Sequence, residues 1–132
     1  MANYDWKNFL DFSSWLIGYS GTTKPDDETI SRVAISRAYY AAFHVAEDYL
    51  ERTEHDEVLT GADHEKVCMA FKNMNKGNTK YNSTCQLIGN VLTMLKTKRR
   101  ICDYKSNYTV TLKEAKYTFK KAEMIIKEIT QL

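Results

Sequence analysis

Apolar residues recur at helical spacing in five stretches of this 132-residue chain, and no stretch alternates convincingly with the two-residue period of a β-strand. The most regular stretch, 29–52, contains no Gly or Pro and is apolar on more than one side, which is typical of a central, largely buried helix. The other four stretches are 4–17, 62–73, 83–104 and 111–132. Connections of roughly five to ten residues predict an all-α fold, an antiparallel up-and-down helical bundle of about five helices.

Several polar residues mark where these helices begin. Thr29 or Ser31 can cap the start of the second helix, and Asp63 can cap the third. Thr111 followed by Glu114 has the spacing of a capping box. In the last stretch, one row of apolar residues is expected to face the core: Leu112, Ala115, Phe119, Ala122, Ile126 and Ile129.

Composition supports a single globular domain over residues 1–132, because 43% hydrophobic and 27% charged residues are ordinary for such domains. The three cysteines are odd in number, form no CxxC pair and have no nearby His, which argues against a disulfide framework or a zinc site. The N-terminal sequence lacks the pattern of a signal peptide, and the apolar runs are too short to cross a membrane. We therefore expect a cytoplasmic protein without membrane contact, metal or other cofactor.

The net charge of +2 hides a strong polarity along the chain. Residues 1–65 hold 5 Lys/Arg against 13 Asp/Glu, whereas residues 66–132 hold 14 against 4. Either the two halves pair with each other, or the protein presents one acidic and one basic face. The basic residues are Lys113, Lys116, Lys120, Lys121 and Lys127 on one face of the last helix, joined by Lys96, Lys98, Arg100 and Lys105. Such a face is either a solvated surface or a contact for a nucleic-acid backbone.

Arg99 continues the apolar row of the stretch 83–104, at a position where Leu or Ile would be expected. A guanidinium group keeps its charge, so a buried one needs a carboxylate, a phosphate or water as partner. Two interpretations stand side by side. Arg99 either extends to the surface with Asp103 as its i+4 partner, or it is held in a groove to meet an anionic group.

Arg37, Tyr40 and His44 share one side of the predicted central helix. Together they are a candidate acid–base and phosphate-binding group, because His transfers protons near neutral pH and Arg binds phosphate. The structural alternative is that Tyr40 and His44 form hydrogen bonds within the bundle while Arg37 lies at the surface.

Four segments taken together resemble the HEPN domains of prokaryotes. They are SRAYYAAFHVAEDYL (36–50), DHEKVCMAF with His64 at a helix start, KRRICDY (98–104) and the closing KEAKYTFKKAEMIIKEI. The chain is most similar to small stand-alone members whose fourth helix ends in Arg-x-x-Ala-Asp-Tyr. That pattern here is Arg99, Arg100, Ile101, Cys102, Asp103 and Tyr104, with Cys in place of Ala. The resemblance covers about residues 29–130.

The resemblance implies a homodimer and, for many members, a metal-independent ribonuclease that acts in toxin–antitoxin or phage-defence systems. It also implies a nucleotidyltransferase antitoxin as a frequent partner. In such members an Arg stabilises the phosphate, and a His four to six residues later assists attack by the RNA 2′-hydroxyl. Two copies of this motif meet in a cleft of the dimer.

Here Tyr104 stands at the place of that His, and no His follows Arg99. A Tyr hydroxyl with an ordinary pKa near 10 is a poor base at pH 7, so the sequence leaves enzymatic activity open. Proton transfer would require that His44 approach Arg99, or that neighbouring arginines tune Tyr104. We therefore carry two hypotheses. In the first, Arg99, Asp103, Tyr104 and His44 form a catalytic site, with RNA bound by Arg100, Lys96, Lys98, Lys105, Arg37 and Tyr40. In the second, the chain is a non-catalytic module that binds a partner protein such as a nucleotidyltransferase.

Overall fold

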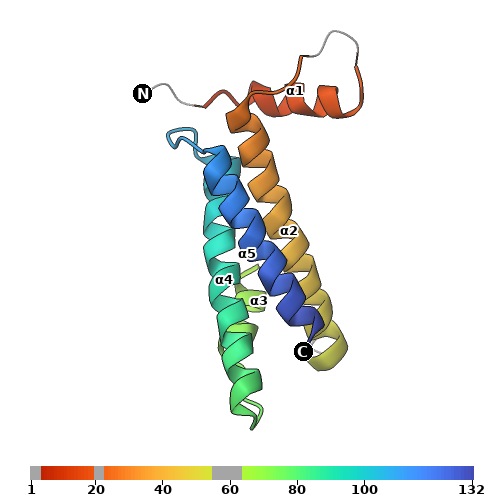
Figure 1. The fold of residues 1–132 in the computed structure, drawn as a ribbon, viewed down its shortest axis with the longest axis vertical. Coiled ribbons are helices and arrows are strands. Elements are labelled where there is room, and N and C mark those ends of the chain that lie inside the picture. Colours follow the sequence, from red (N-terminus) through yellow and green to blue (C-terminus); the bar gives the residue numbers. More distant parts are fainter. Residues whose placement is uncertain (1–3, 20–22, 55–63) are drawn as a thin grey trace.

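The computed structural model describes residues 4–19, 23–54 and 64–132, and every regular element in these ranges is an α-helix. The helices are α1 (Lys7–Leu16), α2 (Asp27–Glu54), α3 (His64–Lys72), α4 (Thr79–Tyr104) and α5 (Leu112–Thr130). The predicted all-α helical bundle is therefore confirmed (Figure 1). None of the helices in these ranges is long and apolar enough to cross a membrane.

The three longest helices pack lengthwise, and α1 lies across the end of the bundle where α2 begins (Figure 1). The short helix α3 runs in the same direction as α2, because His64 at the start of α3 contacts Tyr39 near the middle of α2, and Phe71 near the end of α3 contacts Tyr49 further along α2. Helix α4 runs in the opposite direction to α2 and α5 (Figure 1). The first part of α2 and the last part of α4 therefore lie side by side at the end of the bundle that is near α1.

The core is formed where α2, α3, α4 and α5 meet. Its fully buried large side chains include Phe43 of α2, Phe71 of α3, Leu92 of α4 and Ile125 of α5. Gly89 lets α3 approach α4 closely, because a Cβ atom at this position would lie only 2.7 Å from the backbone nitrogen of Lys72. The absence of a side chain at Gly89 is therefore a packing requirement.

The start of α2 differs from the expectation. Asp26, rather than Thr29 or Ser31, acts as the cap, because its Oδ1 accepts a hydrogen bond of 2.8 Å from the backbone nitrogen of Thr29. Both predicted caps are buried within the first turns of the helix. The Ser31 hydroxyl donates to the carbonyl of Asp27 at 2.6 Å, a bond that a Ser inside a helix commonly makes. The helix therefore begins at Asp27, before either predicted cap.

At the start of α5 the cap is confirmed, since the Thr111 hydroxyl accepts a hydrogen bond of 3.2 Å from the backbone nitrogen of Glu114. The predicted cap Asp63 lies outside the described residues. Helix α4 begins at Thr79, earlier than predicted. Asn78 caps it by accepting a bond of 3.0 Å from the backbone nitrogen of Tyr81.

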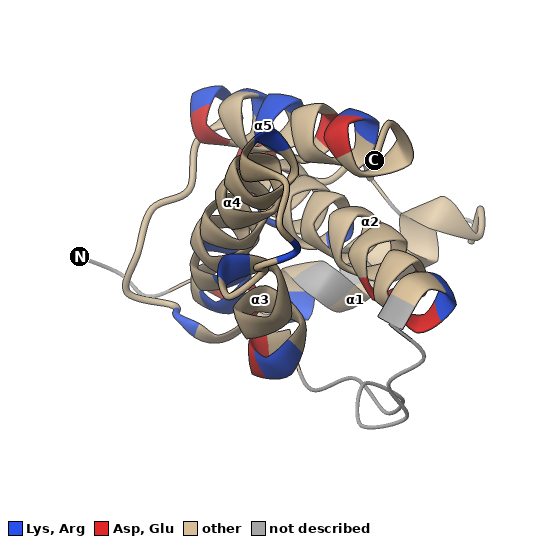
Figure 2. Ribbon diagram, turned by 90° about the horizontal axis from the view of Figure 1, so that it is seen from below, with Lys and Arg blue, Asp and Glu red and all other residues tan. Residues whose placement is uncertain are grey.

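The apolar row predicted for α5 is only partly buried. Phe119 is 56% exposed and Leu112 is 37% exposed, which contradicts their assignment to the core. The buried stripe instead comprises Ala115, Thr118, Ala122, Ile125 and Ile129. Helix α5 packs against both α2 and α4, so its buried stripe lies between the two neighbours and includes Thr118. Along the outside of α5, basic and acidic segments alternate (Figure 2).

A buried arginine that the sequence did not single out fixes the end of α4 against the start of α2. The Arg32 side chain is fully buried, and its Nη1 donates to the carbonyls of Cys102 at 2.9 Å and Lys105 at 3.0 Å. Its Nη2 donates to the carbonyl of Tyr108 at 2.6 Å, and its Nε donates to Glu28 at 3.3 Å. A cation at these carbonyls also suits the negative end of the α4 dipole. Arg32 therefore sets how α2 and α4 lie next to each other.

Candidate functional site

Arg99 is buried between α2 and α4, with only 8% of its side chain exposed. Its Nη1 lies 3.7 Å from Oδ2 of Asp103, the i+4 partner expected from the sequence. That distance is too long for a strong charge-assisted hydrogen bond. The Nε of Arg99 is buried and has no hydrogen-bond partner in the described part of the chain. Arg99 does not extend to the surface, and its charge is incompletely paired.

Three tyrosine rings surround this guanidinium group. The Cζ atom of Arg99 lies 5.4 Å from the ring centroids of both Tyr39 and Tyr40, and 5.8 Å from that of Tyr104. These distances are within the reach of cation–π attraction. Aromatic rings stabilise a cation without accepting its N–H groups in hydrogen bonds, so hydrogen-bonding capacity remains.

Asp103 is the carboxylate closest to this cluster. The Ser36 hydroxyl donates to its Oδ2 at 3.1 Å. Burial raises the pKa of the Asp103 carboxyl, and this effect outweighs the opposite influence of the Ser36 hydrogen bond and of the Arg99 and Arg37 charges. The single carboxylate beside Arg99 thus lies 3.7 Å away and leaves its Nε without an acceptor in the described contacts, so the cluster has room for an added anion.

The candidate residues Arg37 and Tyr40 on α2 are joined to Arg99 through the ring of Tyr40. Arg37 is exposed, its Cζ lies 4.7 Å from the centroid of Tyr40, and its Nη2 donates to the Ser36 hydroxyl at 3.4 Å. Tyr40 thus contacts Arg37 on its own helix and Arg99 on α4. The two candidate groups that the sequence placed on separate helices form one cluster.

His44 occupies the edge of this cluster. Its side chain is 65% exposed, and its Nδ1 lies 3.6 Å from Oε1 of Glu47 on the same helix. The ring stacks at 6.1 Å on Tyr40, which therefore contacts both His44 and Arg99. His44 thus makes no direct contact with Arg99 among the contacts described, although both contact the Tyr40 ring.

The site also contains an imidazole that sequence reasoning did not assign to it. The Nδ1 of His64, at the start of α3, lies 2.5 Å from the Tyr39 hydroxyl, and its ring stacks 4.2 Å from Phe43. Burial raises the pKa of Tyr39, so this hydroxyl stays protonated and can donate to the imidazole or accept from it. The contact joins residues 25 positions apart on different helices. No local spacing in the sequence signals it.

A groove of about 540 Å³ opens beside Asp103, between α1, α2 and the end of α4. Helices α2 and α4 contribute the polar residues Ser36, Arg37 and Asp103, and Tyr104 forms part of the wall. The α1 side contributes Phe12, Ser13 and Leu16. Three residues predicted for the site, Arg37, Asp103 and Tyr104, therefore line one surface depression.

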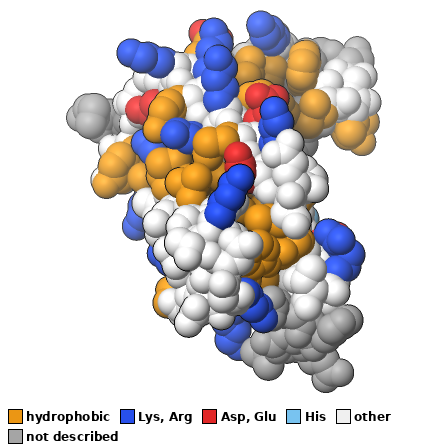
Figure 3. Space-filling view, turned by 60° about the horizontal axis from the view of Figure 1, so that its bottom comes forward, with side chains coloured by type: hydrophobic (Ala, Val, Ile, Leu, Met, Phe, Trp, Pro, Cys, Tyr) orange, Lys and Arg blue, Asp and Glu red, His pale blue; other side chains and the backbone are white. Residues whose placement is uncertain are grey.

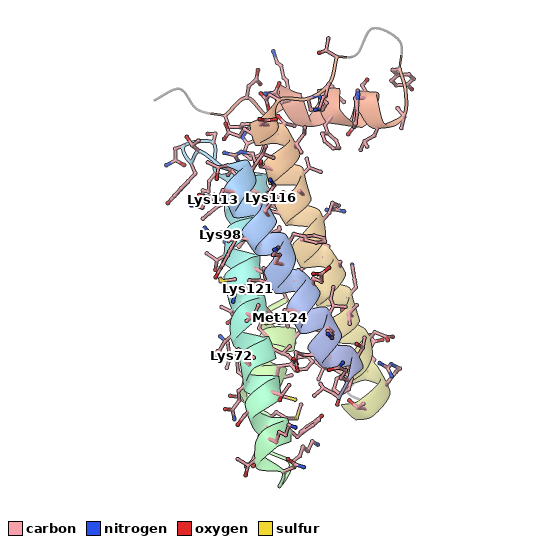
Figure 4. All side chains as sticks on the ribbon, viewed as in Figure 1. Lys72, Lys98, Lys113, Lys116, Lys121 and Met124 are labelled. Carbon is pink, nitrogen blue, oxygen red and sulfur yellow. The ribbon has the colours of Figure 1, made fainter. Side chains whose placement is uncertain are left out.

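The predicted basic residues on α4 do not all share one side of the helix, because Lys98 lies two positions after Lys96 and therefore about 160° around the axis from it. Lys96 pairs with Glu65 of α3 at 3.0 Å. Lys98 lies five positions before Asp103, which places it about 140° away around the helix. Figure 4 shows Lys98 on α4 together with Lys113, Lys116 and Lys121 on α5. Arg100 and Lys105 are exposed. Among the described residues, no cluster of three His, Cys, Asp or Glu side chains could hold a metal ion.

Comparison of this chain with known protein families, with curated proteins and with solved structures finds no match.

Proposed function

We propose that this protein is a HEPN-like RNA-associated protein that binds the phosphate backbone of single-stranded RNA around Arg99. The observation that carries this proposal is the buried guanidinium group, whose Nε has no partner and whose carboxylate lies 3.7 Å away. Burying a charge is costly unless it is paired and hydrogen-bonded. A phosphate oxygen supplies both the opposite charge and the missing acceptor.

The surroundings of Arg99 support an anionic ligand. Arg37 and Arg99 both contact Tyr40, whereas Asp103 is the single carboxylate that faces them in the contacts described. Tyr104 is 67% exposed on the last turn of α4, where its ring can stack on an unpaired base. Guanidinium groups next to an accessible aromatic ring are a common combination in proteins that bind single strands.

In its more detailed form, the proposal places two copies in a homodimer that acts in a toxin–antitoxin or phage-defence system. The motifs around residues 36–50 and 98–104 support this form. Metal-independent cleavage would then use Arg99 to stabilise the phosphate. His44 or His64 would accept the proton of the attacking RNA 2′-hydroxyl, because each contacts a tyrosine that also contacts Arg99.

The second candidate function is a non-catalytic module that binds a partner protein such as a nucleotidyltransferase. It is favoured by the exposed apolar surface of α1 and the residues that follow it, where Leu10 is 71% exposed and Leu16 and Ile17 are also exposed. Hydrophobic side chains also gather in patches among Lys and Arg on the face shown in Figure 3. Contiguous apolar surface of this kind marks protein contacts.

The test is the binding of a fluorescein-labelled single-stranded RNA, followed by anisotropy, to the wild-type protein and to Arg99→Met. We expect the variant to lose roughly tenfold in affinity, the equivalent of one charge-assisted contact. Arg52→Met is the matched control, because Arg52 also forms an i,i+4 pair, with Asp48, but is exposed at the far end of α2. That control should bind RNA as the wild type does.

Salt provides the second arm of the test. With about three phosphate contacts on a single strand, affinity should fall about twentyfold between 50 and 200 mM salt. Equal binding by the wild type and Arg99→Met, or binding that is insensitive to salt, would overturn the proposal. A wild-type protein that binds no RNA but captures a nucleotidyltransferase through α1 would establish the second candidate instead.

A further inference from the structure

We infer that the groove between α1, α2 and α4 is a nucleobase pocket in which Asp103 selects bases that carry an exocyclic amino group. This inference rests on the proposed function, because it names what the bound RNA presents to the same site. It adds a preference for cytosine over uracil, which neither the sequence motifs nor the phosphate contact implies.

The position and size of the groove suit one nucleotide. Its volume of about 540 Å³ lies within the range of about 300–1,000 Å³ that is typical of small-molecule pockets. Asp103 lines the groove and also lies beside Arg99, so a phosphate at Arg99 places the attached nucleoside next to this opening. Arg37 stands on the groove wall as an exposed second cation.

The walls of the groove supply surfaces for an aromatic ring. Tyr104 lines one side from α4, and Phe12 lines the other from α1. Leu16 and Val33 complete the apolar part. Stacking on such side chains tolerates every base, since each has a π face, so it provides affinity and no selection. Selection must therefore come from the polar lining.

Asp103 provides an acceptor inside this lining. Two contacts hold the carboxylate, the hydrogen bond from Ser36 and the ion pair with Arg99, and both involve Oδ2. They fix the orientation of the group and oppose the rise in its pKa that burial causes. An ionised carboxylate accepts hydrogen bonds and cannot donate them. Its natural counterpart on a base is an amino group such as N4 of cytosine, whereas uracil presents the O4 acceptor at that position.

The experiment compares cytidine and uridine 5′-monophosphate, which differ in the hydrogen-bonding groups of the ring, by titration followed with NMR. We expect the cytidine nucleotide to bind about tenfold more tightly, as one correct contact to a base edge gives. Asp103→Asn introduces an amide donor at the same position, so it should weaken cytidine binding and strengthen uridine binding. Asp48→Asn, an exposed carboxylate elsewhere on α2, is the matched control and should leave the ratio unchanged.

A second variant, Tyr104→Ala, keeps the inference testable if Asp103→Asn does not fold. Tyr104→Ala should weaken both nucleotides equally and preserve their ratio, because Tyr104 stacks on either base. Equal affinity of the wild type for the two nucleotides, no binding of either, or an unchanged ratio in a folded Asp103→Asn would each overturn the inference. RNA binding that depends on Arg99 without base preference would overturn the inference alone. Base preference with no RNA binding would overturn the proposed function and leave a mononucleotide pocket.

Discussion

Replacing each of the two arginines buried in the described ranges by methionine separates a guanidinium group that stabilises the fold from one that lacks partners. Arg32 and Arg99 both lie between α2 and α4, and both are almost fully enclosed. We expect Arg32→Met to reduce the free energy of unfolding by about 3–5 kcal/mol, the usual effect of breaking a buried ion pair. For Arg99→Met we expect a loss of about 1 kcal/mol or less.

The magnitude for Arg32 follows from its bonds. Its two Nη groups donate to the carbonyls of Cys102, Lys105 and Tyr108, and its Nε donates to Glu28. Methionine restores none of these, so carbonyls that are buried or partly buried lose a donor, and Glu28 keeps the backbone nitrogen of Val110 as its donor. Each unsatisfied buried acceptor costs about 1–3 kcal/mol, and such terms are only partly additive.

The magnitude for Arg99 is the balance of small terms. The variant loses one ion pair of 3.7 Å and the attraction to three tyrosine rings. It also removes a buried Nε that has no partner, which relieves a desolvation cost. A methionine side chain packs well against aromatic rings, by about 0.3–1.5 kcal/mol for a sulfur contact. The loss and the gain therefore nearly cancel.

The assay is urea unfolding followed by circular dichroism, with equal denaturant slopes required so that the midpoints report stability. Arg52→Met serves as the exposed control and should change stability by no more than about 0.5 kcal/mol. A loss for Arg99→Met as large as that for Arg32→Met would refute the reasoning. Arg99 would then be a structural residue, and the argument for phosphate binding would lose its basis.

Three further outcomes are expected. Ser36→Ala should raise the pKa of Asp103 further, as measured by carboxyl-carbon NMR. A higher folded-state pKa reduces the free energy of unfolding while the carboxyl is ionised. This reduction has its full size above the folded-state pKa and disappears as the pH falls below the ordinary value near 3.9. Gly89→Ala should destabilise by about 1–3 kcal/mol in urea unfolding through overpacking, although Ala favours helices; a gain in stability would contradict the close approach of α3. Tyr39→Phe should cost about 1 kcal/mol and shift the ring nitrogen-15 signals of His64; unchanged signals would show that the hydroxyl does not hold the imidazole.

Local patterns in the sequence predicted the parts of this fold that depend on local interactions. Helical spacing located the helices, and the i+4 rule placed Asp103 beside Arg99 because both lie on one turn of α4. The buried stripe of α5 was misplaced because it depends on the direction from which α2 and α4 approach. Spacing along one helix specifies which residues share a face but not which face meets two neighbours at once.

Arg32 shows a different limit of sequence reasoning. Its partners are mostly backbone carbonyls about 70 residues away, beginning with Ile101 and Cys102. Backbone acceptors leave no trace in residue type, so an arginine that binds them looks like any charged residue on a helix. The charge asymmetry along the chain likewise did not predict which residues form ion pairs. The ion pair between Glu65 and Lys96 joins the acidic half to the basic half, whereas the pairs of Arg32, His44, Arg52 and Arg99 each lie within one half.

The assembly of the site depends on the register between α2 and α4. Arg32 holds the residues at the end of α4, Ser36 bonds to Asp103, and Tyr40 contacts Arg99. The step of four residues from Ser36 to Tyr40 along α2 is thus matched by a step of four residues back along α4, from Asp103 to Arg99. A shift of one turn would place Tyr40 beside Asp103 and take the α2 rings of Tyr39 and Tyr40 away from Arg99. Arg32 fixes this register but touches neither the groove nor Arg99 in the described contacts. It therefore acts on the site only by setting how α2 and α4 are aligned. Its loss should therefore reduce RNA binding even under conditions where the variant remains folded.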